Sequence, residues 1–157
     1  MSDVYGYQWV KVSGVANVGE IIIGEMQILD SNGTNIATNG TAFGAPVNYT
    51  AYPAQGAFSG VIGGYQNTYN LCILSSPGYI GYHTTTRMKC VSVRLASSPG
   101  YPDHFLVNGT IFGSNNSTDG VDGDWDTLAI SVQMSPIGGA WTEFELVENR
   151  ITRRQIV

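Results

Sequence analysis

Charged residues are scarce in this sequence, and basic residues are scarcer than acidic ones. Only 12% of the 157 residues are Asp, Glu, Lys or Arg, and the formal net charge is -5. A nucleic-acid partner is not expected, because phosphates repel an acidic chain and counterion release needs clustered cations. The sequence also lacks a polybasic patch and an apolar run of about 18 residues, so we expect no membrane partner.

Cysteine is nearly absent, and the start of the chain does not have the pattern of a secretory signal. MSDVYGYQWV contains neither a basic beginning nor an apolar stretch, so such a signal is not expected. The two cysteines, Cys72 and Cys90, are then expected to be buried free thiols in a reducing cytoplasm. One disulfide between them is the alternative that the sequence leaves open.

Motifs that carry catalysis are also missing. The sequence has no Gly-x-Ser-x-Gly nucleophile elbow, no His-Glu-x-x-His helix and no phosphate-binding glycine loop. His83 and His104 stand outside any ligand-spaced pair, and His83 is predicted to be a structural or surface residue. On one strand Glu20 and Glu25 would lie on opposite faces unless Gly24 forms a bulge, so a glycosidase pair lacks geometric support. We predict a protein that is not an enzyme and has no organic cofactor.

Glycine and turn-forming residues are abundant, and short strand-like segments recur between them. The chain has 20 glycines, and YQWVKVSGV at 7–15 alternates along the strand with a period of two. Spacing of roughly ten residues between such segments predicts one antiparallel β-sandwich or barrel. Pro46 and Pro53 predict an irregular stretch over 34–56. The predicted strands are 7–15, 20–29 with a bulge at Gly24, 70–74, 78–83, 89–96, 104–114, 125–134 and 141–147.

The order of these segments resembles that of discoidin-like, or galactose-binding-domain-like, jelly rolls. YPAQGAFSG (52–60) is similar to the Ala-Phe-Asp-Gly loop of that family, and PGYIGYHTTTRMKCVSVRL (77–95) to its central strands. PDHFLVNGTIFGSNNSTDGVDGDWDTL (102–128) is the most specific match. The resemblance covers roughly 7–147 and implies an all-β jelly-roll sandwich over 1–149. Such domains are frequent in bacteriophage tail and other virion proteins, and many members bind carbohydrates or cell surfaces.

The sequence departs from the family pattern at three positions. Ser59 takes the place of the loop aspartate, and Tyr69 and Tyr79 stand where tryptophans are usual. In calcium-containing relatives this loop supplies ligands to the ion. A hydroxyl in place of a carboxylate weakens such a site, because Ca²⁺ prefers several charged oxygens.

An acidic stretch at 119–126 raises the question of a metal site. Asp122, Asp124 and Asp126 have the spacing of the first ligands in an EF-hand, but Thr127 replaces the required glycine and Gln133 the closing glutamate. We expect a solvated β-turn that leads into a strand with Trp125 and Leu128 in the core. A low-affinity Ca²⁺ site is the alternative. Its candidate ligands are Asp119, Asp122 and Asp124.

Tyrosines and arginines are the candidates for contact with other molecules. The sequence is rich in tyrosine, whose rings stack on sugars or close the mouth of a sandwich. The candidate ligand-binding residues are Tyr49, Tyr52, Tyr65 and Tyr69, in the loop-rich region that resembles the ligand-facing end of the family. The C-terminal segment 150–157 is predicted to be a basic arm that reaches an acidic neighbour, or else a last strand with exposed arginines. Its candidate docking residues are Arg150, Arg153 and Arg154.

Two functions follow as expectations. The first is a non-enzymatic structural protein of a bacteriophage virion, in the tail, fibre attachment, baseplate or capsid surface. It implies other virion proteins as partners, a homo-oligomer, and a location in the virion after assembly in the host cytoplasm. The alternative is a carbohydrate-binding, lectin-like module that recognises glycans on the host cell surface.

Overall fold

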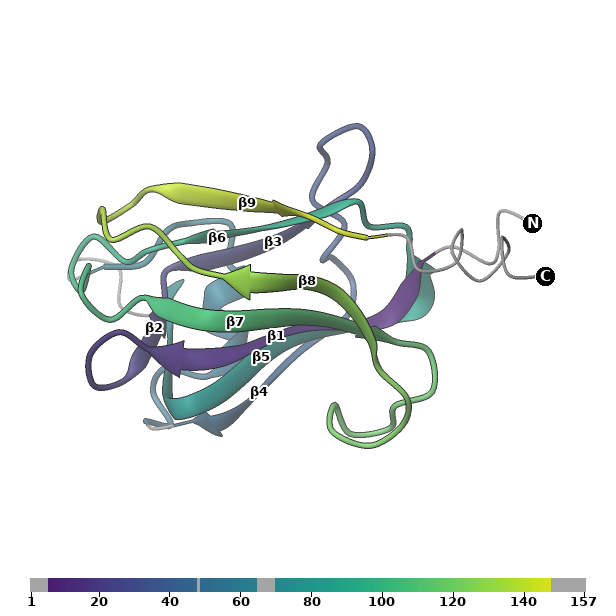
Figure 1. Ribbon diagram of the computed structural model, residues 1–157, viewed down its shortest axis with the longest axis horizontal. Helices are drawn as coiled ribbons and strands as arrows, with labels where there is room; N and C mark the ends of the chain where they lie inside the picture. The colour runs from purple at the N-terminus through teal and green to yellow at the C-terminus, as the bar shows by residue number, and fades with distance from the viewer. Residues whose placement is uncertain (1–5, 48, 65–69, 148–157) are drawn as a thin grey trace.

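The computed structural model describes residues 6–47, 49–64 and 70–147, and these form two packed antiparallel sheets. Figure 1 shows the sheets as the two layers of a sandwich, which confirms the predicted all-β sandwich. A short 3₁₀ helix, η2 (Ala54–Phe58), lies in the chain between β4 and β5 of the larger sheet. Within the described residues, one sheet contains β1 (Tyr7–Ala16), β2 (Ile21–Ile23), β4 (Thr41–Val47), β5 (Cys72–Met88), β7 (Leu106–Ser114) and β8 (Asp126–Val132), and the other contains β3 (Glu25–Leu29), β6 (Ser92–Ala96) and β9 (Trp141–Glu145).

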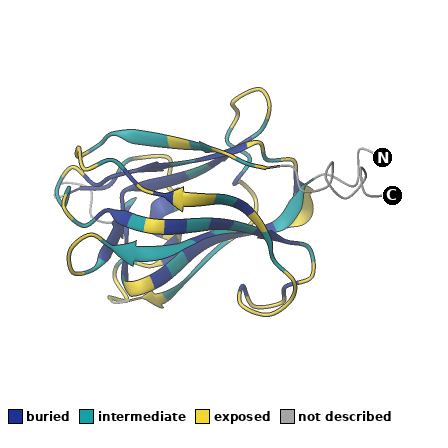
Figure 2. Ribbon diagram, viewed as in Figure 1, coloured by how far each residue is buried: buried dark blue, intermediate teal, exposed yellow. Residues whose placement is uncertain are grey.

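In β1, the period-two pattern of the sequence decides which face of the strand is buried. In β1, Val10 and Val12 are fully buried, and they pair with Tyr82 and Ile80 of β5. The buried and exposed residues of β7 follow one another along the strand in Figure 2. Side chains from the two inner faces therefore meet in one core, as in other sandwiches whose sheets pack face to face.

The segment 20–29 is not the single bulged strand that the sequence predicts. β2 belongs to the larger sheet and β3 to the smaller one, and Gly24 lies at the crossing between them. The Gly24 amide donates to Ala96 O at 2.9 Å, and its carbonyl accepts from the Gly63 amide at 3.0 Å. A Cβ at position 24 would lie 3.1 Å from both Ala96 O and Ile62 Cγ2. The small residue therefore allows the backbone to change sheets.

Two further predictions about strands are wrong, and proline is involved in both. The predicted strands 70–74 and 78–83 are parts of β5, which is 17 residues long and continues through Pro77. The predicted irregular stretch 34–56 contains β4, which pairs with β5 along 41–47. Pro46 lies at the register shift between Ala45 and Val47. Proline has no backbone N–H to donate, and at such an irregularity the sheet does not need one.

The two ends of the described chain lie at the same end of the sandwich. Tyr7 pairs with Met88, and the Leu146 amide donates to Val91 O at 2.9 Å. The turn between β1 and β2 lies at the opposite end, where the Ile22 amide donates to His104 O (Figure 1). Among the described residues, no helix has the length and apolar character needed to cross a membrane.

Candidate functional site

Two of the predicted tyrosines lie together at the end of the sandwich opposite the chain ends. The rings of Tyr49 and Tyr52 meet edge to face, with centroids 6.1 Å apart and planes at 82°. Tyr49 is 49% exposed, whereas Tyr52 is half-buried and packs against Ile22, Leu71 and Ile73. The small apolar cluster fixes the inner ring, and the outer ring is presented to solvent.

Residues that sequence reasoning missed complete this end. Tyr101 packs against the same small cluster, and its ring meets His104 edge to face at 6.3 Å. His104 Nδ1 lies 3.2 Å from the Glu20 carbonyl oxygen, and the Tyr49 hydroxyl lies 3.4 Å from Glu20 Oε1. We call Glu20, Tyr49, Tyr52, Tyr101 and His104 the aromatic end. No signal in the sequence pointed to Tyr101, because it reaches this end through contacts with distant segments.

The other candidate contact residues fall outside the part of the chain that the structure describes. They are Tyr65, Tyr69, Arg150, Arg153 and Arg154. Their predicted roles therefore stay predictions. Tyr79 lies on β5, and its ring centroid is 6.2 Å from that of Phe43.

The acidic stretch forms a loop whose carboxylates accept hydrogen bonds from the loop itself. Asp122 accepts from the hydroxyl and amide of Thr118, the hydroxyl of Ser117 and the amide of Asp119. These donors, with Thr118 first, lower the pKa of Asp122 well below its ordinary value. Asp119 Oδ1 accepts from the amides of Val121 and Asp122, both at 2.8 Å. The loop is a chain of side-chain-to-backbone turns.

The predicted cation ligands do not form one group. Asp124 Oδ2 accepts from Asn116 Nδ2 at 2.9 Å, and Asp126 accepts from the Tyr7 hydroxyl at 2.9 Å. Over the described residues, no three His, Cys, Asp or Glu side chains are placed to hold a metal ion together. The Ca²⁺ site with Asp119, Asp122 and Asp124 as ligands stays a prediction that this geometry does not favour.

The same loop folds back onto the outer face of the larger sheet. Lys11 Nζ donates to Gly120 O at 2.7 Å and lies 3.9 Å from the centre of the Trp125 ring. Desolvation by burial lowers the pKa of Lys11. Trp125 is half-buried over Lys11, so its predicted place in the core is wrong, whereas Leu128 is 1% exposed and is a core residue as predicted. The contact between the Lys11 ammonium and the Trp125 ring thus holds the acidic loop against β1.

His83 and the two cysteines have structural environments. The His83 ring stacks on Trp9 with centroids 3.8 Å apart, which agrees with its predicted structural role. Both cysteines are free, as predicted, but only Cys72 is buried, whereas Cys90 is half-buried. Burial raises the pKa of Cys72 to about 12 and that of Cys90 to about 11. Both thiols are therefore protonated and poor nucleophiles at neutral pH.

Glu25 is a buried carboxylate beneath the loop that contains Ser59 and Gly60. It is 0% exposed, and its Oε2 accepts from the Gly60 amide at 2.8 Å. Burial raises its pKa to about 7, while the Gly60 and Ser59 hydrogen bonds act in the opposite direction. Glu20 belongs to the aromatic end, and Glu25 belongs to the smaller sheet. The two glutamates therefore lie apart because the chain changes sheets between them, and not because they occupy opposite faces of one strand as the sequence argument assumed.

Fold and surface together define an antiparallel β-sandwich with an exposed aromatic end. Searches of protein-family models, of curated proteins and of solved structures find no match to this chain. The resemblance to discoidin-like domains therefore stays a prediction that rests on the quoted segments.

Proposed function

We propose that this chain is a non-enzymatic structural subunit of a bacteriophage virion, with a discoidin-like jelly-roll sandwich that docks on neighbouring subunits. The observation that carries the docking role is the aromatic end. Tyr49 is 49% exposed there, and Val18, in the same turn as Glu20, is 53% exposed. Grouped exposed apolar side chains are typical of contact surfaces. The virion origin is supported by the resemblance of the ordered segments.

The position of the chain ends supports a linking role. The Val147 amide donates to Leu128 O at 2.8 Å, and the basic segment 150–157 follows Val147 in the sequence. The described chain thus ends far from the aromatic end (Figure 1). The last described residue, Val147, and the aromatic end therefore lie at opposite ends of the sandwich, and this arrangement is suited to contacts with two neighbours.

The burial of the strongest acid–base candidate supports a non-enzymatic role. Glu25 has a pKa near neutrality, as a general acid or base would, but its exposed fraction is 0%. No substrate reaches this carboxylate unless the loop at Ser59 and Gly60 opens. Its chemistry is that of a buried structural group.

Homo-oligomerisation tests the docking role. We expect the purified full chain to form an oligomer in light scattering after size exclusion, and Tyr49→Asp to weaken it by placing a charge in the contact. Ser31→Asp, in the exposed turn after β3, is the control and should leave the oligomer unchanged. Immunogold labelling of intact bacteriophage particles, with an antibody against this protein, then tests the location in the virion. A monomer at all concentrations, together with unlabelled particles, would contradict the proposal.

Glycan binding at the aromatic end is the second candidate. The observation that favours it is an exposed tyrosine ring beside the Glu20 carboxylate, since ring stacking plus a hydroxyl acceptor is suited to a sugar. On a glycan array, Tyr49→Ala should weaken any signal about tenfold, the effect of losing roughly 1.4 kcal/mol of ring contact. Trp125→Ala, in the acidic loop, should leave it unchanged. Absence of signal across broad arrays and host cells counts against this candidate.

A further inference from the structure

The sequence contains three Asn-Gly pairs, and the structure places them in different surroundings. They are Asn32-Gly33, Asn39-Gly40 and Asn108-Gly109, and each is followed by threonine. All three asparagines are exposed. In such a pair the glycine nitrogen can attack the side-chain amide of asparagine, because no Cβ on the second residue blocks the approach. The reaction also needs a backbone that moves, so the surroundings of each pair decide where it is fast.

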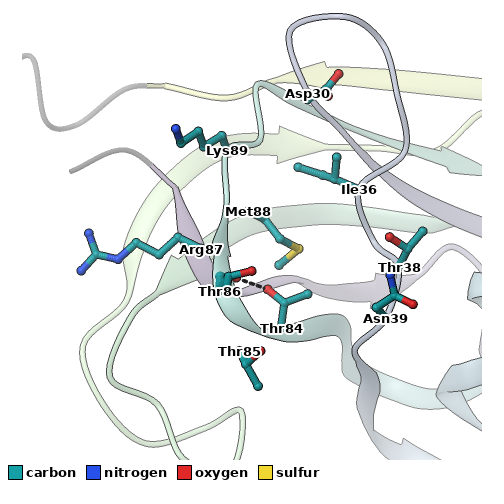
Figure 3. Close-up of a pocket in the computed structure, with 10 residues that line it drawn as sticks. All are labelled: Asp30, Ile36, Thr38, Asn39, Thr84, Thr85, Thr86, Arg87, Met88 and Lys89. Carbon is teal, nitrogen blue, oxygen red and sulfur yellow. Dashed lines mark hydrogen bonds between the residues drawn. The ribbon is translucent and has the colours of Figure 1, made fainter. Parts of the chain in front are cut away.

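Asn32-Gly33 lies in an exposed turn that follows β3. Residues 31–34 are all exposed, and Figure 3 shows the turn as the loop between Asp30 and Ile36, which projects away from the strands. The Gly33 amide donates to Asp30 O at 3.0 Å, a bond within the turn itself. A Cβ at Gly33 would meet no atom within 4 Å. The local opening that releases this amide therefore breaks bonds of the turn and leaves the sheets intact.

Asn39-Gly40 is held against the larger sheet. Asn39 lines the pocket of Figure 3, between its own segment and the end of β5. The Gly40 amide donates at 2.8 Å to the hydroxyl of Tyr82, a buried residue of β5. A Cβ at Gly40 would overlap the His83 carbonyl oxygen, so the backbone lies close against β5. Movement of the Gly40 nitrogen thus breaks tertiary contacts, which costs more than at Gly33.

Asn108-Gly109 is part of a strand inside the larger sheet. Both residues belong to β7, which pairs with β1 on one side and with β8 on the other. Gly109 is buried opposite Val132 of β8, and a Cβ there would lie 2.6 Å from Leu106 Cδ2. Its nitrogen moves when the sheet opens, which costs much of the free energy of global unfolding.

We propose that Asn32 is a site of spontaneous deamidation, with water as the co-reactant. The Gly33 nitrogen attacks Cγ of Asn32, so that an N–Cγ bond forms and the Cγ–Nδ2 bond breaks. Nδ2 leaves as ammonia with the proton that the Gly33 nitrogen gives up, and a cyclic succinimide remains. Water then opens either carbonyl of this ring, which gives aspartate or isoaspartate at position 32. The site lies outside the aromatic end, so the inference goes beyond the proposed function.

The isoaspartate product lengthens the main chain in a turn that precedes the cover of β3. β3 is an edge strand of the smaller sheet. After the turn, the Ile36 amide donates to Ile28 O at 2.8 Å, and Asn35 Oδ1 accepts from the Ile28 amide at 3.2 Å. An additional main-chain methylene at position 32 shifts Asn35 and Ile36 along β3. The edge of the sheet then loses part of the cover that blocks pairing with other strands.

The experiment follows the three pairs in the full chain at mildly alkaline pH by peptide mapping and mass spectrometry. We expect the rate at Asn32 to exceed the rates at Asn39 and Asn108 by about tenfold or more, because an opening free energy of roughly 1.4 kcal/mol slows a reaction tenfold. In urea-unfolded protein the three rates should converge, because each asparagine is followed by Gly-Thr and the surroundings are then alike.

Tyr82→Phe tests the physical cause of the order. This variant keeps the buried ring and removes the hydroxyl that accepts from the Gly40 amide. It should raise the rate at Asn39 several-fold and leave the rate at Asn108, the matched control, unchanged. Gly33→Ala places a Cβ beside the attacking nitrogen, so it should slow the reaction at Asn32 in the folded and the unfolded chain alike.

The outcomes decide the proposal. A rate at Asn32 in the folded chain no higher than at Asn39 and Asn108 overturns it, and so does the same order of rates in the unfolded chain. Hydrogen exchange of the separated isoaspartate fraction tests the product. Faster exchange at the Ile28 and Ile36 amides supports the loss of cover at β3, and unchanged exchange there contradicts it.

Discussion

Replacing Gly81 by alanine is expected to destabilise the protein by roughly 3–5 kcal/mol, near the upper end for single substitutions. Gly81 lies in β5 and pairs with Lys11 of β1. A Cβ there would overlap the Val10 carbonyl oxygen and lie 2.6 Å from Phe43 Cζ and 2.8 Å from Lys11 Cβ. The strand backbones cannot separate at this point, because buried residues on both sides of Gly81 pair with β1. The strain is therefore retained in the folded state.

Urea unfolding measures this effect, and Gly33→Ala provides the matched control. Gly33 has a φ of 77°, and a Cβ at this position would have open space around it. Its substitution should therefore cost only about 1 kcal/mol, from backbone conformation alone. Equal losses at positions 33 and 81 would show that the close approach of β1, β4 and β5 at Gly81 does not exist.

Stability is expected to fall as the pH rises from about 4.5 to about 7, and Glu25 is the cause. Burial raises the pKa of Glu25 from 4.5 to about 7 in the folded chain. Between these values the folded state holds a proton that the unfolded state has lost. The free energy of unfolding then decreases with pH, by up to about 1.4 kcal/mol per pH unit. The contribution of Glu25 to the free energy of unfolding is complete below about pH 4.5 and is lost above about pH 7.

The surroundings of Glu25 determine how the test is designed. The Gln27 side chain hydrogen-bonds to Glu25, and Gln27 Oε1 accepts from Arg94 Nε at 2.8 Å. Arg94 is thus the nearby charge that faces this region from β6, and it also lies 4.2 Å from the Trp141 ring. Glu25→Gln keeps the shape and an acceptor for the Gly60 amide but cannot ionise. Denaturant unfolding from pH 4 to pH 8 should therefore show a flatter profile for this variant.

The free energy of unfolding is plotted against pH for the wild-type chain and for Glu25→Gln. The difference between these two profiles isolates the titration of Glu25 from that of the other groups. Over the full window it should approach about 3 kcal/mol, the value that follows from the shift in pKa. Parallel profiles for the two proteins would mean that Glu25 titrates normally, and that the loop at Ser59 and Gly60 does not bury it.

Much of the candidate site was accessible to sequence reasoning where the relevant contacts are local. Tyr49 and Tyr52 are three residues apart, and they do lie together. The donors that occupy Asp122 come from Ser117 to Asp119, a few residues away, so the expectation of a turn agrees with the geometry. Turn chemistry depends on neighbours in the chain, and these are visible in any sequence.

The rest of the site depends on contacts between distant segments. Tyr101 and His104 reach the aromatic end through long-range contacts, among them the hydrogen bond from the Ile22 amide to His104 O. Trp125 lies over Lys11 because the acidic loop folds back onto β1. Neither contact leaves a periodic signal in the sequence, since each joins residues more than eighty positions apart.

By itself, the sequence determined the all-β class, the position of most strands and the inward residues such as Val10 and Val12, because alternation records one-sided burial within a single strand. Only the tertiary structure decided that the chain changes sheets at Gly24, that β5 continues through Pro77, and that β4 pairs despite Pro46. These features depend on which strand lies alongside. Pairing of that kind is a property of the whole sheet, since its hydrogen bonds join segments that local residue preferences do not connect.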